Sequence, residues 1–191
     1  MKRLALALIA TLALLGAACG NDDTPALQEG SSPVAHNDAD VAFAQGMIPH
    51  HEQAVVMSEM ALKQAGSPKV KDLAGRIKEA QGPEISQMKG WLKDWNQPVA
   101  PAQGGGQSGM SGMSGMSGMM SDAEMGQLEK SGGAAFDKLF LEGMIRHHEG
   151  AVTMAKEEQA KGQFPEAKAL ALRIIEAQQS EITEMNGLLK A

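Results

Sequence analysis

The chain has 191 residues, with 17 basic and 23 acidic side chains and a formal net charge of −6. Nucleic-acid binding normally needs a basic face, so this balance argues against a nucleic-acid partner. A single cysteine rules out an intramolecular disulfide and a cysteine-rich metal site. Helix-forming residues dominate and only 3% of the residues are aromatic, so we expect an all-α protein.

Residues 1–18 are predicted to be the signal peptide of a bacterial lipoprotein. Lys2 and Arg3 precede the apolar stretch LALALIATLALLGAA, which is too short for a lasting membrane span. Small residues then lead to Cys19, as in a lipoprotein cleavage box, so we predict lipidation of Cys19. We expect a flexible tether over 19–37 and a location outside the cytoplasm, anchored to the cell membrane on the periplasmic side or at the cell surface. The alternative is an ordinary secretory signal with a chance cysteine.

Two segments of the chain, 97 residues apart, share one pattern. They read GMIPHHEQAVVM at 46–57 and GMIRHHEGAVTM at 143–154. The match extends without a gap to Met88 in the first copy and Met185 in the second. We therefore interpret the chain as an internal duplication.

Each copy is predicted to form a helix hairpin. The first copy spans 38–95, and its GSP sequence breaks the helix, with Pro68 suited to a first helical turn. The second copy spans 122–191, and KGQFP at 161–165 marks its break. Apolar residues recur at helical spacing, so the two hairpins are expected to bury their apolar sides together as one four-helix bundle domain.

A Gly/Ser-rich linker over 96–121 joins the copies and is expected to be mobile. Its methionines recur at every third position, although a solvated linker has no core for them to fill. We consider them further candidate metal ligands, and a simple repeat expansion is the alternative. These methionines are Met110, Met113, Met116, Met119 and Met120.

The histidine pairs and nearby methionines fall on one face of each predicted first helix. Because successive residues turn by about 100°, Met47, His50, His51 and Met57 share the side that carries Phe43. That side faces the core, so two imidazoles and two thioethers converge inward. The second copy repeats the arrangement with Met144, His147, His148 and Met154.

We interpret these constellations as copper sites. Each buried imidazole without a partner destabilises the folded state by roughly 1–3 kcal/mol. We therefore expect four of them to be kept only if they bind a ligand such as a metal ion. Imidazole and thioether ligands together select copper, above all Cu(I), with Cu(II) as the alternative. The Glu-x-x-His pattern of di-iron bundles is missing, and a zinc site leaves the methionines unexplained. The competing interpretation is methionine core filler with internally hydrogen-bonded histidines.

The second helix of each copy carries polar and thioether groups at the height of the histidines. Gln81 and Glu84 are predicted to turn inward and accept the second N–H of a metal-bound imidazole. In the alternative, Glu84 points to solvent at a helix edge. Met88 and Met185 are further candidate metal ligands. The polar positions of the second copy are Gln178 and Glu181.

The stretches FAQGMIPHHEQAVVM and FLEGMIRHHEGAVTM, followed by EAQGPEISQMKGWL and EAQQSEITEMNGLL, resemble the domain of unknown function 305 (DUF305) family. That family includes copper-binding proteins of the CopM type. The resemblance covers about 38–95 and 122–190, and it implies a ferritin-like four-helix bundle with extracytoplasmic copper binding. The copper ligands that it implies are the Met-x-x-His-His and following Met residues of the two copies, named above.

These observations favour a binding protein and not an enzyme. The leading interpretation is a copper-binding lipoprotein that sequesters or buffers copper and contributes to copper tolerance or handling. A second interpretation is a structural or partner-binding bundle without metal. A third is a metalloenzyme that uses the histidines, although we find no convincing base, nucleophile or open carboxylate site.

The relative direction of the two copies decides where their histidines lie. Bundles most often join neighbouring helices by the shorter route, so we expect the first helices of the copies to run parallel. Both histidine pairs then lie at the same height, close enough to share a copper ion or hold a close pair. In the alternative, the linker crosses the bundle and the first helices run antiparallel. The pairs would then separate toward opposite ends, because we place them before the middle of their helices.

Overall fold

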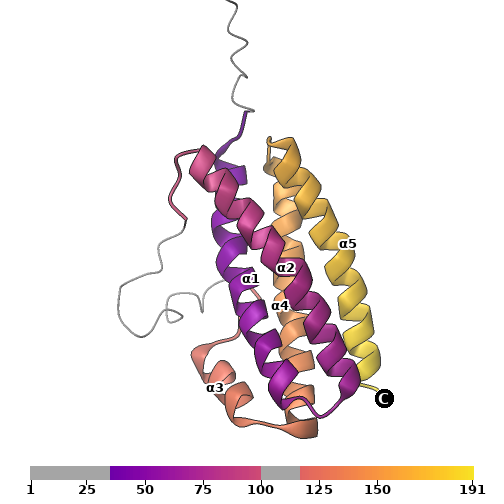
Figure 1. Ribbon diagram of the computed structural model, residues 1–191. Coiled ribbons are helices and arrows are strands. Elements are labelled where there is room, and N and C mark those ends of the chain that lie inside the picture. Colours follow the sequence, from indigo (N-terminus) through magenta and orange to yellow (C-terminus); the bar gives the residue numbers. More distant parts are fainter. Residues whose placement is uncertain (1–34, 100–116) are drawn as a thin grey trace, which may run out of the picture. The chain divides into compact units, whose positions relative to one another are not determined.

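The computed structural model describes residues 35–99 and 117–191, and within these ranges it is built from helices. The helices are α1 (Asp38–Gln64), α2 (Pro68–Asp94), α3 (Asp122–Lys130), α4 (Gly133–Lys161) and α5 (Pro165–Leu188) (Figure 1). No strand occurs in the two ranges, so the all-α expectation is confirmed. None of the helices there is long and apolar enough to cross a membrane.

Some of the sequence predictions concern residues outside these ranges. They are the signal peptide, the lipidated cysteine at Cys19, most of the tether, and three linker methionines, Met110, Met113 and Met116. All of them stay predictions.

Both predicted helix breaks are observed. Helices α2 and α5 each begin with a proline, Pro68 and Pro165, whose missing N–H is not needed in a first turn. Helix α1 begins after Asn37, whose side chain accepts hydrogen bonds from the backbone N–H groups of Ala39 and Asp40. Helices α1, α2 and α5 and the end of α4 therefore lie where the sequence indicates, whereas α4 begins at Gly133 and not at residue 122.

The short helix α3 was not predicted, since 122–191 was assigned to the second hairpin as a whole. Ser121 caps α3 by accepting the N–H of Glu124, and Glu124 reaches back to the N–H of Ser121. The chain then breaks before α4, where Gly133 has a φ of 60° that favours glycine. The chain between the linker and the second hairpin thus contains a structural element of its own.

Helices α1 and α4 run antiparallel. Asp40, at the start of α1, accepts a 2.9 Å hydrogen bond from the N–H of Phe164 in the turn after α4. Asp137, near the start of α4, accepts a 2.9 Å bond from the N–H of Gly66 in the turn after α1. The start of each helix therefore lies beside the end of the other, and the expected parallel arrangement is wrong. The crossover arrangement is the one observed.

The crossover follows from where the hairpins end. Helix α2 ends beside the start of α1, whereas α4 begins beside the turn between α1 and α2. The end of α2 and the start of α4 therefore lie at opposite ends of the bundle, and α3 lies at the end that holds the α1–α2 turn (Figure 1). Fewer contacts join α2 to α5 than join α1 to α4, so the α1–α4 seam is the centre of the fold.

The buried core divides into two clusters along this seam. The start cluster contains buried residues between 43 and 48 of α1, with Ala151 and Ala155 of α4. The end cluster contains buried residues between 54 and 61 of α1, with residues between 136 and 144 of α4. In both helices the histidine pair falls between the two clusters, so a polar layer lies at the centre of an otherwise apolar core.

Replacing Asp40 with alanine is expected to lower the free energy of unfolding by roughly 2–4 kcal/mol, because buried backbone N–H groups lose a charged acceptor. The Asp40 carboxylate is 0% exposed and accepts hydrogen bonds from Asn37, Gln163 and Phe164. These backbone bonds outweigh the effect of burial and lower the pKa of the Asp40 carboxyl. Urea unfolding measures the loss. The exposed Asp38→Ala variant, in the same helical turn, is the control and should lose well under half as much.

Candidate metal centre

The four paired histidines meet at the centre of the bundle. All four are 0% exposed, and the ring centroids of His50 and His147 lie 3.7 Å apart. His50 and His51 occupy the middle of α1, and His147 and His148 occupy the middle of α4. The middles of two antiparallel helices coincide, so the pairs lie at the same height, as expected. The expectation that antiparallel helices would separate the pairs is wrong, because the pairs do not lie before the middle of their helices.

One histidine of each pair contacts a glutamate on the second helix of its own copy. His51 Nε2 lies 2.8 Å from a carboxylate oxygen of Glu84, and His148 Nε2 lies 2.6 Å from one of Glu181. A carboxylate only accepts, so Nε2 carries the hydrogen in both rings. The predicted inward position of both glutamates is therefore observed, and their role toward a metal stays a prediction.

Of the six remaining imidazole nitrogens, five have no hydrogen-bond partner. His50 Nε2 lies 3.3 Å from the carbonyl oxygen of Ser117, which again places the hydrogen on Nε2. In all four histidines Nδ1 is buried without a hydrogen-bond partner, and His147 also lacks one at Nε2. Each such nitrogen costs roughly 1–3 kcal/mol when left unpaired. Buried lone pairs of this kind are free to bind a metal ion, since a metal-bound imidazole usually donates its other N–H to an oxygen.

Burial keeps the central rings neutral. It lowers the pKa of His50 to about 3, with a smaller contribution from repulsion by His51. Burial likewise lowers the pKa of His147 well below its usual range, with repulsion from His50 adding to the effect. Neutral imidazole is the form that binds a metal, so these two rings are in the binding form at pH 7.

Methionines lie on both sides of the histidine layer. Met47 is in the start cluster, and half-buried Met154 packs against that cluster. Met57 and Met144 are in the end cluster and are 0% exposed. Each side of the histidine layer therefore combines thioethers from both copies. From the sequence, Met47 and Met57 were instead predicted to act together with the histidines of their own copy. The further candidates Met88 and Met185 are divided between the start and end clusters in the same way.

Two buried glutamines also face the interior. Gln81 and Gln178 are each 3% exposed, and the amide oxygen of each has no hydrogen-bond partner. Both were predicted on the inward face at the height of the histidines. Their unused oxygens add neutral acceptors to the centre of the bundle.

The donor set at the centre is soft and borderline in character. Among residues 35–99 and 117–191, no three His, Cys, Asp or Glu side chains form a metal-binding group. A metal held by those residue types alone, as zinc and di-iron sites are, has no ready-made cage in this part of the chain. Imidazole nitrogens with thioether sulfurs above and below them suit copper or another soft ion.

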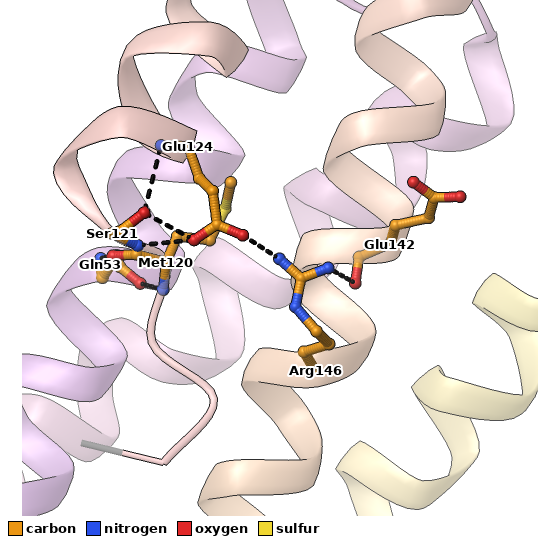
Figure 2. Close-up of polar contacts among 6 residues, drawn as sticks. All are labelled: Gln53, Met120, Ser121, Glu124, Glu142 and Arg146. Carbon is orange, nitrogen blue, oxygen red and sulfur yellow. Dashed lines mark hydrogen bonds and ion pairs between the residues drawn. The ribbon is translucent and has the colours of Figure 1, made fainter. Parts of the chain in front are cut away.

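The end of the linker packs over the centre, which the sequence analysis missed. Gln53 exchanges two hydrogen bonds with the backbone of Met120, at 2.8 and 2.9 Å (Figure 2). The Met120 side chain is 5% exposed and fills a space beside Gly143, where a Cβ would lie 2.8 Å from its sulfur. The expectation that linker methionines have no core to fill is therefore wrong for Met120, while Met119 is half-buried.

Two glycines allow this close approach. Gly118 has a φ of 84°, and a Cβ there would lie 2.3 Å from the carbonyl oxygen of Arg146. A Cβ at Gly150 would lie 2.0 Å from the carbonyl oxygen of Ser117. Gly150 corresponds to Gln53 in the first copy. This difference between the copies was the sequence feature that could have indicated the packed segment. We call residues 117–120 the strap.

A salt bridge joins α3 to α4 beside the strap. Arg146 Nη2 lies 2.7 Å from a carboxylate oxygen of Glu124, whose other oxygen accepts from Ser121 (Figure 2). Both partners of the salt bridge are about half exposed, so its own contribution is small. It fixes the position of α3 next to the strap.

The comparisons with known proteins agree with this architecture. The profile of the family described as domain of unknown function (DUF305) matches residues 40–189. The solved structure of a DUF305 protein from Streptomyces coelicolor is 36% identical and has a TM-score of 0.71, covering 80% of this chain and 92% of that one.

Structures of CopM are similar as well. CopM in the Cu(I)-bound form is 32% identical, with a TM-score of 0.65, and covers 79% of this chain and 95% of that one. The Cu(II)-bound form is 35% identical, with a TM-score of 0.67 and the same coverage. An uncharacterized protein of Acanthamoeba polyphaga mimivirus is 49% identical over 53 residues, which span 28% of this chain and 35% of that protein.

Proposed function

Because the chain belongs to the DUF305 family and is similar in structure to CopM, which has been solved in Cu(I)-bound and Cu(II)-bound forms, we propose that it is an extracytoplasmic protein that sequesters or buffers copper. The observation that carries the proposal is the set of four buried imidazoles whose Nδ1 atoms have no partner. Thioether groups lie on both sides of them, and this combination of ligands favours Cu(I) over harder ions. Copper is then the cargo of the protein, held at the centre of the bundle.

The structure supports a storage or buffering role more than catalysis. The four histidine side chains are 0% exposed, so an organic substrate in solvent has no direct contact with them. We propose that the protein is a binding protein without enzymatic activity. Oxygen consumption by the copper-loaded protein in the presence of a reductant tests this, and turnover above that of free copper would contradict it.

The proposed lipid anchor rests on the sequence before residue 35. Lipidation of Cys19 would hold the protein at the membrane, where a copper buffer meets incoming ions. Mass spectrometry of the mature N-terminus checks this directly, since an unmodified terminus at a different residue would contradict the proposal.

Metal binding is tested by its effect on unfolding. A ligand that binds only the folded state stabilises it by about 4 kcal/mol at a thousandfold excess over its Kd. We expect Cu(I) and Ag(I) to raise the melting temperature clearly and Zn(II) to raise it little, because thioethers prefer soft ions. Thermal unfolding with each ion, followed by circular dichroism, gives the answer. No stabilisation by either soft ion would favour the structural bundle without metal.

Replacing Glu84 with alanine is expected to weaken Cu(I) binding by roughly 10- to 100-fold, because His51 loses the acceptor that fixes its ring. The change also leaves the buried N–H of His51 without a partner, so the free energy of unfolding of the metal-free protein should fall by roughly 1–3 kcal/mol. Competition with a chromophoric Cu(I) chelator measures the affinity. The control is Glu79→Ala, at an exposed position of the same helix, which should leave the affinity unchanged. An equal loss in both variants would show a general effect of charge.

A further inference from the structure

The thioethers along the α1–α4 seam form a row that passes through the histidine layer. The register that places His50 against His147 also brings Phe43 to the same cavity as Met154. At 1.5 Å per residue, Met47 lies about 5 Å and Met154 about 10 Å along the axis from the histidines. Successive soft ligands are thus spaced at short intervals toward the start of α1. The matching positions on the other side are Met144 and Met57.

The two ends of this row differ in their access to solvent. Met57 is 0% exposed and belongs to the end cluster, which also contains Met120, Met125 and Leu128. The strap and α3 therefore cover that end. Met154, its counterpart in the duplication, is half-buried and lines a cavity of ≈ 230 Å³.

The cavity has a composition that suits a small soft cation. Ala39 and Ala42 leave room in its wall, and Met154 supplies a sulfur there. Glu158 also lines it and is 1% exposed, and burial together with a hydrogen bond shared with Asp40 raises the pKa of its carboxyl to about 8, so the group is neutral at pH 7. The other charged side chains of the wall, Glu157 and Lys161, form a salt bridge of 3.6 Å, so the Met154 sulfur is the group in the wall that a soft cation would contact.

We propose that copper enters the bundle through this cavity, with Met154 as its first thioether ligand and Met47 as the step to the histidines. The proposal rests on the copper-binding function proposed above and adds the route to that site. Met57, at the covered end, has no part in uptake. The duplication has thus produced two chemically equivalent ends, of which the chain closes one and leaves the other open.

A buried methionine outside the proposed ligands supplies the control variant. Met154→Leu and Met125→Leu each remove one sulfur at nearly constant volume, so both proteins should fold. Met125 lies in the end cluster, at the covered end of the row. Cu(I) is supplied as its bicinchoninate complex, and the loss of colour after rapid mixing gives the loading rate. Stoichiometry is measured after equilibration. A third variant, Ala42→Trp, narrows the cavity without removing a ligand.

We expect Met154→Leu and Ala42→Trp to slow loading by roughly tenfold or more, within the range over which association rates vary among variants of one site. Met125→Leu should load at the wild-type rate, and Ala42→Trp should reach the wild-type stoichiometry at equilibrium. Equal loading rates for Met154→Leu, Met125→Leu and wild type would overturn the route while leaving copper binding intact. A wild-type protein that takes up no Cu(I) would overturn the proposed function, and the route with it.

Discussion

A variant with His50 and His147 both replaced by leucine is expected to lose at least roughly a hundredfold in Cu(I) affinity, about 2.7 kcal/mol. Without metal, the same variant should be more stable than the wild type by roughly 1–3 kcal/mol. The two rings contact each other at the centre of the core and leave three nitrogens unpaired. Leucine removes those nitrogens and keeps most of the volume. The opposite signs of the two effects distinguish a binding site from a structural core, because a structural core would only lose stability.

Chelator competition gives the affinity, and urea unfolding of the metal-free protein gives the stability. The control is His36→Leu, since His36 stacks on Trp95 outside the histidine layer, with ring centroids 4.5 Å apart. That variant should bind copper as the wild type does. Wild-type affinity in the double variant would show that the central histidines do not bind the metal. Alanine at all four histidines also removes the ligands, but it leaves cavities that lower stability for an unrelated reason.

Replacing Gly150 with alanine is expected to lower the free energy of unfolding by about 2 kcal/mol, although alanine favours a helix over glycine. A Cβ at this position would lie 2.0 Å from the carbonyl oxygen of Ser117 and 3.1 Å from the Cα of Gly118. Both contacts are with backbone, so the strap has to move away from α4. That movement breaks the two hydrogen bonds between Gln53 and Met120 and exposes the Met120 side chain.

The matched control is Gly75→Ala, in the interior of α2. A Cβ there meets nothing within 4 Å, so the variant should gain roughly 0.5–1 kcal/mol from helix propensity. Urea unfolding of both variants, together with hydrogen exchange at the Met120 amide, separates strap displacement from a general effect on helices. Stabilisation by both substitutions would show that the strap does not depend on Gly150.

The local features of the fold were predictable because each has a local cause. Pro68 and Pro165 are the first residues of α2 and α5. Each directly follows a turn, and both turns are recognisable in the sequence. The inward face of Met47, His50, His51 and Met57 follows from helical spacing alone, and all four side chains are 0% exposed. The partnership of Glu84 with His51 was predictable for the same reason, because a short turn fixes which positions of a hairpin face each other.

The strap could not be predicted from composition. Its sequence continues the Gly/Ser/Met repeat of the linker, and only contacts with α1 and α4 distinguish its last residues from the rest. The substitution of Gly150 for Gln53 between the copies is visible in the sequence. The structural role of Gly150 becomes clear only when the segment packed against it, the strap, is known.

By itself, the sequence determined the four long helices, the inward histidines and methionines, and the soft character of the donor set, because helical periodicity and ligand chemistry are local properties. Only the tertiary structure decided that α1 and α4 run antiparallel. That choice depends on long-range contacts, in which Asp40 and Asp137 each accept hydrogen bonds from the turn of the other copy. It also decided that thioethers from different copies share each side of the histidine layer and that one end of their row is covered. These features arise from packing between segments far apart in the chain. The sequence of one segment does not indicate which distant segment it will contact.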